Sequence, residues 1–142
     1  PPESEGAASR GRHVDVNLST QYARFYDTDG SVIWRSYLVS GNTSMGRGTP
    51  TGTFALNAKR TDEMLIGADE NHDGQPDYKS HVNYWMPFVG NSVGLHDATW
   101  RSRFGGTIYA WNGSHGCVNL PYDDAERLYE LINVGDTVYV HW

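Results

Sequence analysis

Residues 113–133 read GSHGCVNLPYDDAERLYELIN, and the second half of this stretch has an apolar face at helical spacing. The face lies at positions i, i+3, i+4 and i+7, which are Ala125, Leu128, Tyr129 and Ile132. Pro121 precedes it, acidic residues fill its first turn, and Gly135 follows it, as at the two ends of a helix. The stretch therefore predicts a helix over 122–133 that directly follows a glycine-containing turn carrying Cys117.

Short strand signals lie on both sides of this stretch. Residues 13–18 alternate apolar and polar side chains, and Asp29-Gly30 predicts a hairpin turn between the aromatic-rich segments 21–27 and 31–40. Further strands are expected at 53–59, 82–89, 92–96, 107–111 and 137–142. Many short strands with one late helix predict a mostly β domain, built as a sandwich or a barrel-like sheet.

The length and composition bound the possible functions. The chain of 142 residues has the size of one domain and a net charge of −6, with no Lys/Arg run that would hold a nucleic acid. No apolar stretch approaches the ~18 residues of a membrane span. Residues 1–9 are small, polar and proline-containing, so we expect a linker from a missing N-terminal region, followed by a domain over 10–142.

Cys117 is the only cysteine, and it has two interpretations. A lone cysteine is usually a small buried hydrophobic residue. Alternatively it is a nucleophile, because a thiol with a nearby histidine to take its proton can attack a carbonyl. Two histidines compete as that base: His115, which shares a face with Cys117 if the segment is extended, and His96, at the end of an expected strand.

The spacing around Cys117 resembles a known family. Seventeen residues separate His96 from Ser114-His115-Gly116-Cys117-Val118-Asn119, which resembles the signature of L,D-transpeptidase catalytic domains of the YkuD type. The stretch 47–54, RGTPTGTF, is similar to the family's Thr-Pro-x-Gly loop. The stretches 84–88, 96–100 and 104–106 are similar to its Gram-positive branch. The resemblance covers roughly residues 12–142 and implies a YkuD-type β-sandwich or barrel-like fold with one α-helix towards the C-terminus.

The resemblance also implies a role for individual residues. Cys117 would be the nucleophile and His96 the general base, oriented by the backbone carbonyl of Asp97. The backbone N–H groups of His115, Gly116 and Cys117 would form the oxyanion hole. Ser114 and Asn119 would support the motif by hydrogen bonds. The substrate channel would be lined by Tyr78, Trp85 and Trp100. For Trp85, plain core packing is an equal alternative.

The implied reaction is acyl transfer between peptidoglycan stem peptides. Cys117 would attack the carbonyl of the third stem residue and release D-Ala, and an amine of a second stem would then form a 3→3 cross-link. No cofactor is implied, and carbapenems would acylate Cys117. We expect a monomer that acts outside the cytoplasm, at the cell wall or cell surface. The alternatives are an L,D-carboxypeptidase, with water as acceptor, and a non-catalytic peptidoglycan-binding module.

Two metal sites have to be weighed as well. Asp69, Asn71, Asp73 and Asp77 stand at the spacing of a calcium loop, but position 12 is Ser80 where a bidentate Glu is needed, so a solvated hairpin tip is favoured. His96, His115 and Cys117 are acceptable zinc ligands, but no CxxC or HExxH spacing accompanies them. A papain-like peptidase is disfavoured because there the cysteine precedes the histidine.

Overall fold

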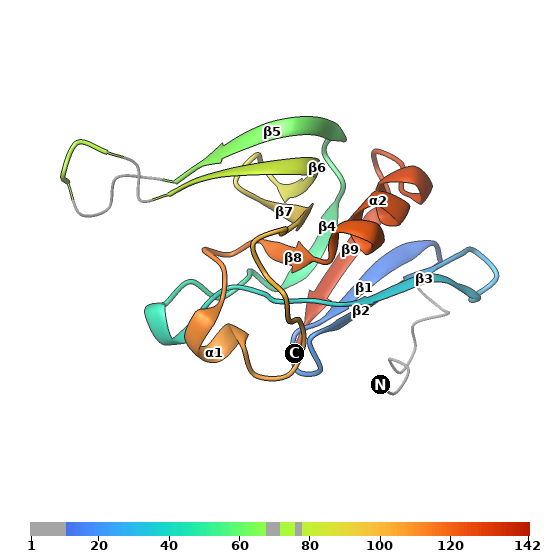
Figure 1. The fold of residues 1–142 in the computed structure, drawn as a ribbon. Coiled ribbons are helices and arrows are strands. Elements are labelled where there is room, and N and C mark those ends of the chain that lie inside the picture. The colour runs from blue at the N-terminus through green and yellow to red at the C-terminus, as the bar shows by residue number, and fades with distance from the viewer. Residues whose placement is uncertain (1–10, 68–71, 76–77) are drawn as a thin grey trace.

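Two β-sheets make up most of the computed structural model, which describes residues 11–67, 72–75 and 78–142 (Figure 1). One sheet has the order β3-β2-β1-β9-β4, with β1 (His13–Asn17), β2 (Tyr22–Tyr26), β3 (Val32–Tyr37), β4 (Gly52–Ala55) and β9 (Thr137–His141). The other has the order β5-β6-β7-β8, with β5 (Arg60–Ile66), β6 (Lys79–Val89), β7 (Val93–Asp97) and β8 (Val118–Leu120). The predicted mostly β class is confirmed.

The helix α2 (Tyr122–Leu131) lies against both sheets, contacting β3 of one and β6 and β7 of the other (Figure 1). Its predicted apolar face is the buried one: Ala125, Leu128 and the following Ile132 are fully buried in a core that also contains Phe25 and Leu95. The helix ends two residues earlier than predicted, because Ile132 has an extended backbone and already leads towards β9.

The turn between β2 and β3 is the predicted hairpin turn. Gly30 has φ +85°, a conformation that favours glycine, and the Asp29 carboxylate accepts hydrogen bonds from the backbone N–H and the hydroxyl of Ser31 at 2.9 and 2.6 Å. These hydrogen bonds lower the pKa of Asp29. The local sequence thus sets both the position and the conformation of this turn.

One predicted strand is wrong. Residues 107–111 are not a strand, and Tyr109–Asn112 form the short helix α1. Gly105 and Gly106 before it have φ +89° and +61°, and the Asn112 N–H donates to the Ile108 carbonyl at 2.7 Å. The aromatic and branched residues there favour a strand, but a strand needs a pairing partner, and this segment has none among the described residues. Helical hydrogen bonds within the segment take its place.

The four-stranded sheet brings the chemically interesting residues together. In β7 and β8, which are parallel, His96 is paired with Asn119, and in the antiparallel pair of β6 and β7 it is paired with Trp85. Cys117 immediately precedes β8. Residues 11 and 23 positions apart in the sequence are therefore neighbours across adjacent strands. The longer β5–β6 hairpin extends past β7 and away from the rest of the fold (Figure 1).

Candidate active site

His96 is buried at the end of β7 and makes a specific hydrogen bond at each ring nitrogen. Its Nδ1 lies 2.7 Å from the backbone carbonyl oxygen of Asp97. Because a carbonyl can only accept, Nδ1 carries the hydrogen of the neutral ring, and Nε2 keeps a lone pair. Burial lowers the pKa of His96, against the opposing effects of the Asp97 carbonyl and carboxylate. At neutral pH His96 is therefore an uncharged base.

Cys117 is the other reactive group, and its side chain is buried but reaches a cavity. Its Sγ donates to the backbone carbonyl oxygen of Ser92 at 3.6 Å. Burial raises the pKa of the thiol to about 11, although a hydrogen bond with the backbone of Gly94 acts in the opposite direction. Both shifts favour the uncharged forms at rest, a thiol and a neutral imidazole, over a thiolate and an imidazolium.

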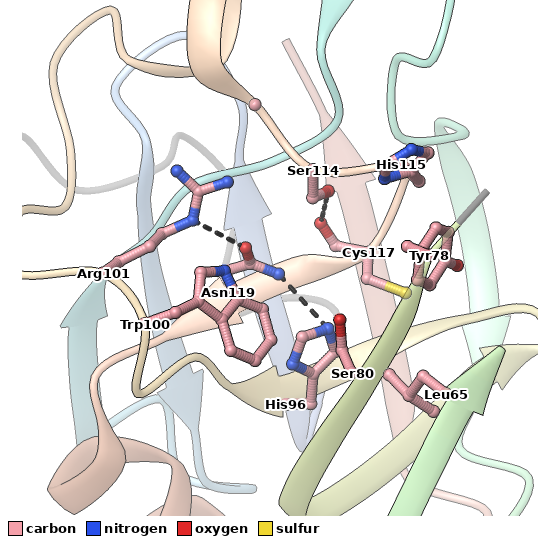
Figure 2. A pocket seen from close by; sticks show the side chains of 11 residues that line it. Leu65, Tyr78, Ser80, His96, Trp100, Arg101, Ser114, His115, Cys117 and Asn119 are labelled. Atoms are coloured by element: carbon pink, nitrogen blue, oxygen red, sulfur yellow. Dashed lines mark hydrogen bonds between the residues drawn. The ribbon is translucent and has the colours of Figure 1, made fainter. Parts of the chain in front are cut away.

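Asn119 connects His96 to a residue that the sequence analysis did not single out. The Asn119 Nδ2 lies 3.2 Å from Nε2 of His96, and its Oδ1 accepts from Nε of Arg101 at 2.8 Å (Figure 2). Arg101 also donates through Nη1 to the carbonyl of Asn112 at 2.7 Å. The only available signal for Arg101 was its place four residues after Asp97, in a segment without an expected strand or helix.

The turn before Cys117 is held by two hydroxyl groups. The Ser114 hydroxyl donates to the Cys117 carbonyl at 2.5 Å and accepts from the Gly116 N–H at 3.1 Å. The Thr49 hydroxyl, from the glycine-rich loop, donates to the Gly116 carbonyl at 2.6 Å and accepts from the Gly41 N–H at 2.9 Å. The Gly116 N–H was expected in the oxyanion hole, so a substrate oxygen there would compete with Ser114.

The carboxylate of Asp97 faces away from the base. It accepts from the backbone N–H groups of Asn83 and Tyr84 at 2.9 and 2.8 Å, and from the Asn83 side chain at 2.8 Å. These contacts tie the end of β7 to β6. Asp97 therefore hydrogen-bonds to the His96 ring through its backbone carbonyl and to β6 through its carboxylate.

Two cavities meet at Cys117. One has a volume of about 190 Å³ and is lined by residues that include His96, Trp100, Arg101 and Asn119 (Figure 2). The other has a volume of about 710 Å³ and lies towards β5, Trp85 and Ser92. Both are lined by Cys117 and by the same three further residues, Leu65, Tyr78 and His115.

The aromatic residues expected near substrate differ in exposure. Tyr78 lines both cavities and packs on His115, with ring centroids 4.3 Å apart, so the His115 side chain contacts Tyr78. Trp100 is 52% exposed and its ring lies 6.0 Å from that of His96. Trp85 is only 2% exposed and packs with Val82 and Cys117, although it also lines the larger cavity.

The structure bears on the zinc hypothesis and on only part of the calcium-loop hypothesis. Asp69, Asn71 and Asp77 of the calcium-loop candidate lie outside the described residues, and the Asp73 carboxylate accepts from the N–H of Gln75 at 2.8 Å. In the described part of the chain no three His, Cys, Asp or Glu residues are placed to hold a metal ion, so the zinc set is not assembled.

No helix among the described residues has the length and apolarity of a membrane span.

Comparisons with known proteins agree with the geometry. Residues 11–140 match the family model of the YkuD L,D-transpeptidase catalytic domain. L,D-transpeptidase 1 of Mycobacterium tuberculosis is 36% identical over 99 residues, which are 66% of this chain and 37% of that protein. The chain spans little more than a third of the length of the curated relatives that it matches.

Solved structures from Enterococcus faecium are similar in fold. The L,D-transpeptidase C442S mutant superimposes with a TM-score of 0.83 at 34% identity, covering 92% of this chain and 50% of the other. The catalytic domain acylated by ertapenem gives a TM-score of 0.78 at 36% identity, covering 92% of this chain and 97% of that domain.

Proposed function

Since the chain belongs to the YkuD family of L,D-transpeptidase catalytic domains, we propose that it cross-links peptidoglycan by cysteine-based acyl transfer. The observation that carries the proposal is the convergence of His96 and Cys117 on one cavity, with a neutral base and a neutral thiol. Residues 10–142 form the catalytic unit. It acts outside the cytoplasm, where peptidoglycan lies, and its partners are two stem peptides.

In the first half-reaction the Cys117 thiol gives its proton to Nε2 of His96 and Sγ attacks the carbonyl carbon of the third stem residue. Nε2 is the only ring nitrogen able to accept, because Nδ1–H is held by the Asp97 carbonyl. The imidazolium then gives the proton to the nitrogen of the leaving D-Ala, and the C–N bond breaks. The product is a thioester between Cys117 and the donor stem.

In the second half-reaction an amine of another stem attacks the thioester carbon. Its proton passes to His96, the C–S bond breaks, and the proton returns to the Cys117 sulfur. The result is a 3→3 peptide cross-link and a regenerated enzyme. Since the cleaved peptide bond is replaced by another peptide bond, the reaction needs no energy source or cofactor.

The backbone around Cys117 supplies the stabilisation of charge. The N–H groups of His115 and Cys117 would donate to the oxyanion, and the Gly116 N–H would join them by leaving the Ser114 hydroxyl. The hydroxyls of Ser114 and Thr49 hold the turn that carries these groups. Preorganisation matters here because donors that are already fixed need no rearrangement when the charge develops.

The two cavities offer the space that a transferase needs at Cys117. A transfer between two stems needs two approaches to one sulfur atom, and cavities of about 190 and 710 Å³ both reach Cys117. Tyr78 and Trp100 offer aromatic faces to the bound stems. An L,D-carboxypeptidase, with water as acceptor, would need only one of these approaches.

Carbapenems are proposed as covalent inhibitors because they can acylate the same thiol as the stem peptide. A strained β-lactam carbonyl presents Cys117 with an acyl group in place of the stem peptide, and a related catalytic domain from Enterococcus faecium has been solved in the form acylated by ertapenem. The acyl-enzyme would form on Cys117, the chain's only cysteine.

The test is product analysis with a purified disaccharide-tetrapeptide, by liquid chromatography and mass spectrometry. The proposal predicts loss of D-Ala and a 3→3 dimer with the wild type, and neither product with Cys117→Ser. Tripeptide without dimer would identify a carboxypeptidase. Intact tetrapeptide with the folded wild type would contradict catalysis and favour a peptidoglycan-binding module.

A further inference from the structure

We propose that Arg101 is a positioning residue that fixes the side-chain amide of Asn119, and through it the protonation state of His96. The inference rests on the proposed function, because it gives His96 the role of the base. It goes beyond that function in naming a residue outside the cysteine motif on which the base depends.

Arg101 reaches the site from a tight turn. Its backbone N–H donates to the carbonyl of Ala98 at 3.2 Å, immediately after β7. From there the guanidinium crosses to β8 and to the end of α1, where Nε bonds to Asn119 Oδ1 at 2.8 Å and Nη1 to the Asn112 carbonyl at 2.7 Å (Figure 2). One planar group therefore joins three segments around the cavity.

The donor-only nature of arginine sets the orientation of the amide. A guanidinium cannot accept a hydrogen bond, so Oδ1 of Asn119 has to face Arg101 and Nδ2 has to face His96. Nδ2 is a donor, and it lies 3.2 Å from Nε2, so Nε2 has to be unprotonated. With Nδ1–H already bonded to Asp97, both ring nitrogens of His96 are specified.

Protonation of His96 would bring two donors face to face. As long as Nε2 stays beside the amide, a hydrogen on it would point at the Asn119 N–H group, and the amide would avoid this contact by turning its oxygen towards His96. That turn would break the Arg101 hydrogen bond and place an N–H group against the guanidinium. Arg101 thus keeps His96 in the form that can accept the thiol proton.

The charges around His96 act in both directions. The Asp97 carboxylate raises the pKa of His96 and the Arg101 guanidinium lowers it, in addition to the larger lowering by burial. Cys117 is neutral at rest, and Tyr78 and His115 are the other titratable side chains that line the same cavity. Removing Arg101 would release the amide and remove a positive charge, and both effects favour the imidazolium.

Arg101 also lines the cavity, which allows a different role. A guanidinium there could bind a carboxylate of the stem peptide directly. A direct ligand would affect KM and leave the His96 ring unchanged in the free enzyme. A positioning residue would change the ring before any substrate is bound.

The experiment is NMR of the ring nitrogens of ¹⁵N-histidine-labelled protein over a pH series, without substrate. The variants are Arg101→Met, which keeps length but no donor, and Arg101→Lys, which keeps charge but not the planar fork. The matched control is Arg103→Met, because Arg103 is an exposed arginine two residues further along the same segment. Far-ultraviolet circular dichroism verifies that each variant is folded. If Arg101→Met does not fold, the comparison is made with Arg101→Lys.

In the wild type and in Arg103→Met we expect His96 to carry its hydrogen on Nδ1 and none on Nε2. Both proteins should show the same pH midpoint for the protonation of His96. In Arg101→Met the pH midpoint of the His96 titration should rise. The rate of Cys117 acylation should fall about 10- to 100-fold at a saturating concentration of the acylating agent. In Arg101→Lys the retained charge restores part of the pH midpoint of the His96 titration, and the hydrogen stays on Nδ1 because the Asp97 carbonyl still accepts it. The proposal is overturned if His96 titrates as in the wild type in every folded Arg101 variant, with only KM changed. Because the NMR signals belong to the free enzyme, they remain informative even if no cross-linking is found.

Discussion

The side-chain nitrogen of Asn119 lies 3.2 Å from Nε2 of His96, so in the resting enzyme the base accepts a hydrogen bond from an amide. The Cys117 thiol meanwhile donates to the Ser92 carbonyl. Nucleophile and base therefore each have another partner before substrate arrives. Proton transfer between them requires Nε2 to exchange the amide for the thiol.

The neutral thiol predicts slow alkylation at neutral pH. Because the pKa of Cys117 is raised to about 11, the thiolate fraction should increase about tenfold per pH unit from pH 7 to 9. The rate of modification by iodoacetamide, measured by mass spectrometry, should rise in the same proportion. Cys117 is the only cysteine, so the signal is unambiguous. A rate that is already constant at pH 7 would indicate a resting thiolate and imidazolium instead.

Asp97→Asn should affect folding more than chemistry. The carboxylate accepts the backbone N–H groups of Asn83 and Tyr84, and an amide would place an N–H group among these donors. We expect the free energy of unfolding to fall by about 1–3 kcal/mol, measured in denaturant. The acylation rate of the folded protein should change only a few-fold. Unchanged stability with lost acylation would mean that the carboxylate itself takes part in the reaction.

Thr49→Val removes a hydroxyl that bridges the glycine-rich loop and the turn before Cys117. The buried Gly41 N–H and Gly116 carbonyl would lose this partner, at a cost of about 1–3 kcal/mol in the free energy of unfolding. Acylation by a carbapenem should also slow, because the oxyanion donors lose a support. Thr49→Ser, which keeps the hydroxyl, is the control and should restore both properties. Equal acylation rates for Thr49→Val and Thr49→Ser would exclude a role of the Thr49 hydroxyl in supporting the oxyanion donors.

Gly116→Ala tests the backbone of the turn. Gly116 has φ +131°, which a residue with a Cβ rarely adopts, although the nearest atom to an added Cβ is 3.7 Å away. The strain is therefore in the backbone, of order 1–3 kcal/mol, and we expect acylation to be lost. Gly46→Ala is the matched control, since Gly46 has φ +69° and open space around it. Wild-type acylation by a folded Gly116→Ala protein would contradict the assigned geometry.

Elements defined by a local pattern could be predicted from the sequence. The apolar period of Ala125, Leu128 and Ile132 gives α2, and Asp29-Gly30 gives the hairpin. The strand β5 has mostly exposed side chains and no apolar face, so it was not expected. The segment 107–111 was misassigned because strand propensity says nothing about whether a partner strand is available.

The reactive residues could be proposed from the sequence, but their connections could not. His96 and Cys117 follow from a spaced motif, whereas the choice between His96 and His115 needed the resemblance to a family. The contact from Arg101 through Asn119 to His96 depends on the parallel register of β7 and β8. Such a register is set by packing across the sheet, and no local pattern around Arg101 reports it.

The most direct test of the central claim is intact-protein mass spectrometry after incubation with a carbapenem. The wild type is compared with Cys117→Ala and His96→Ala, all verified as folded. We predict one adduct on the wild type, none on Cys117→Ala, and formation slowed about 100-fold or more on His96→Ala. An absence of adduct on the folded wild type, or equal rates for the wild type and His96→Ala, would contradict an acyl-accepting Cys117 with His96 as its base.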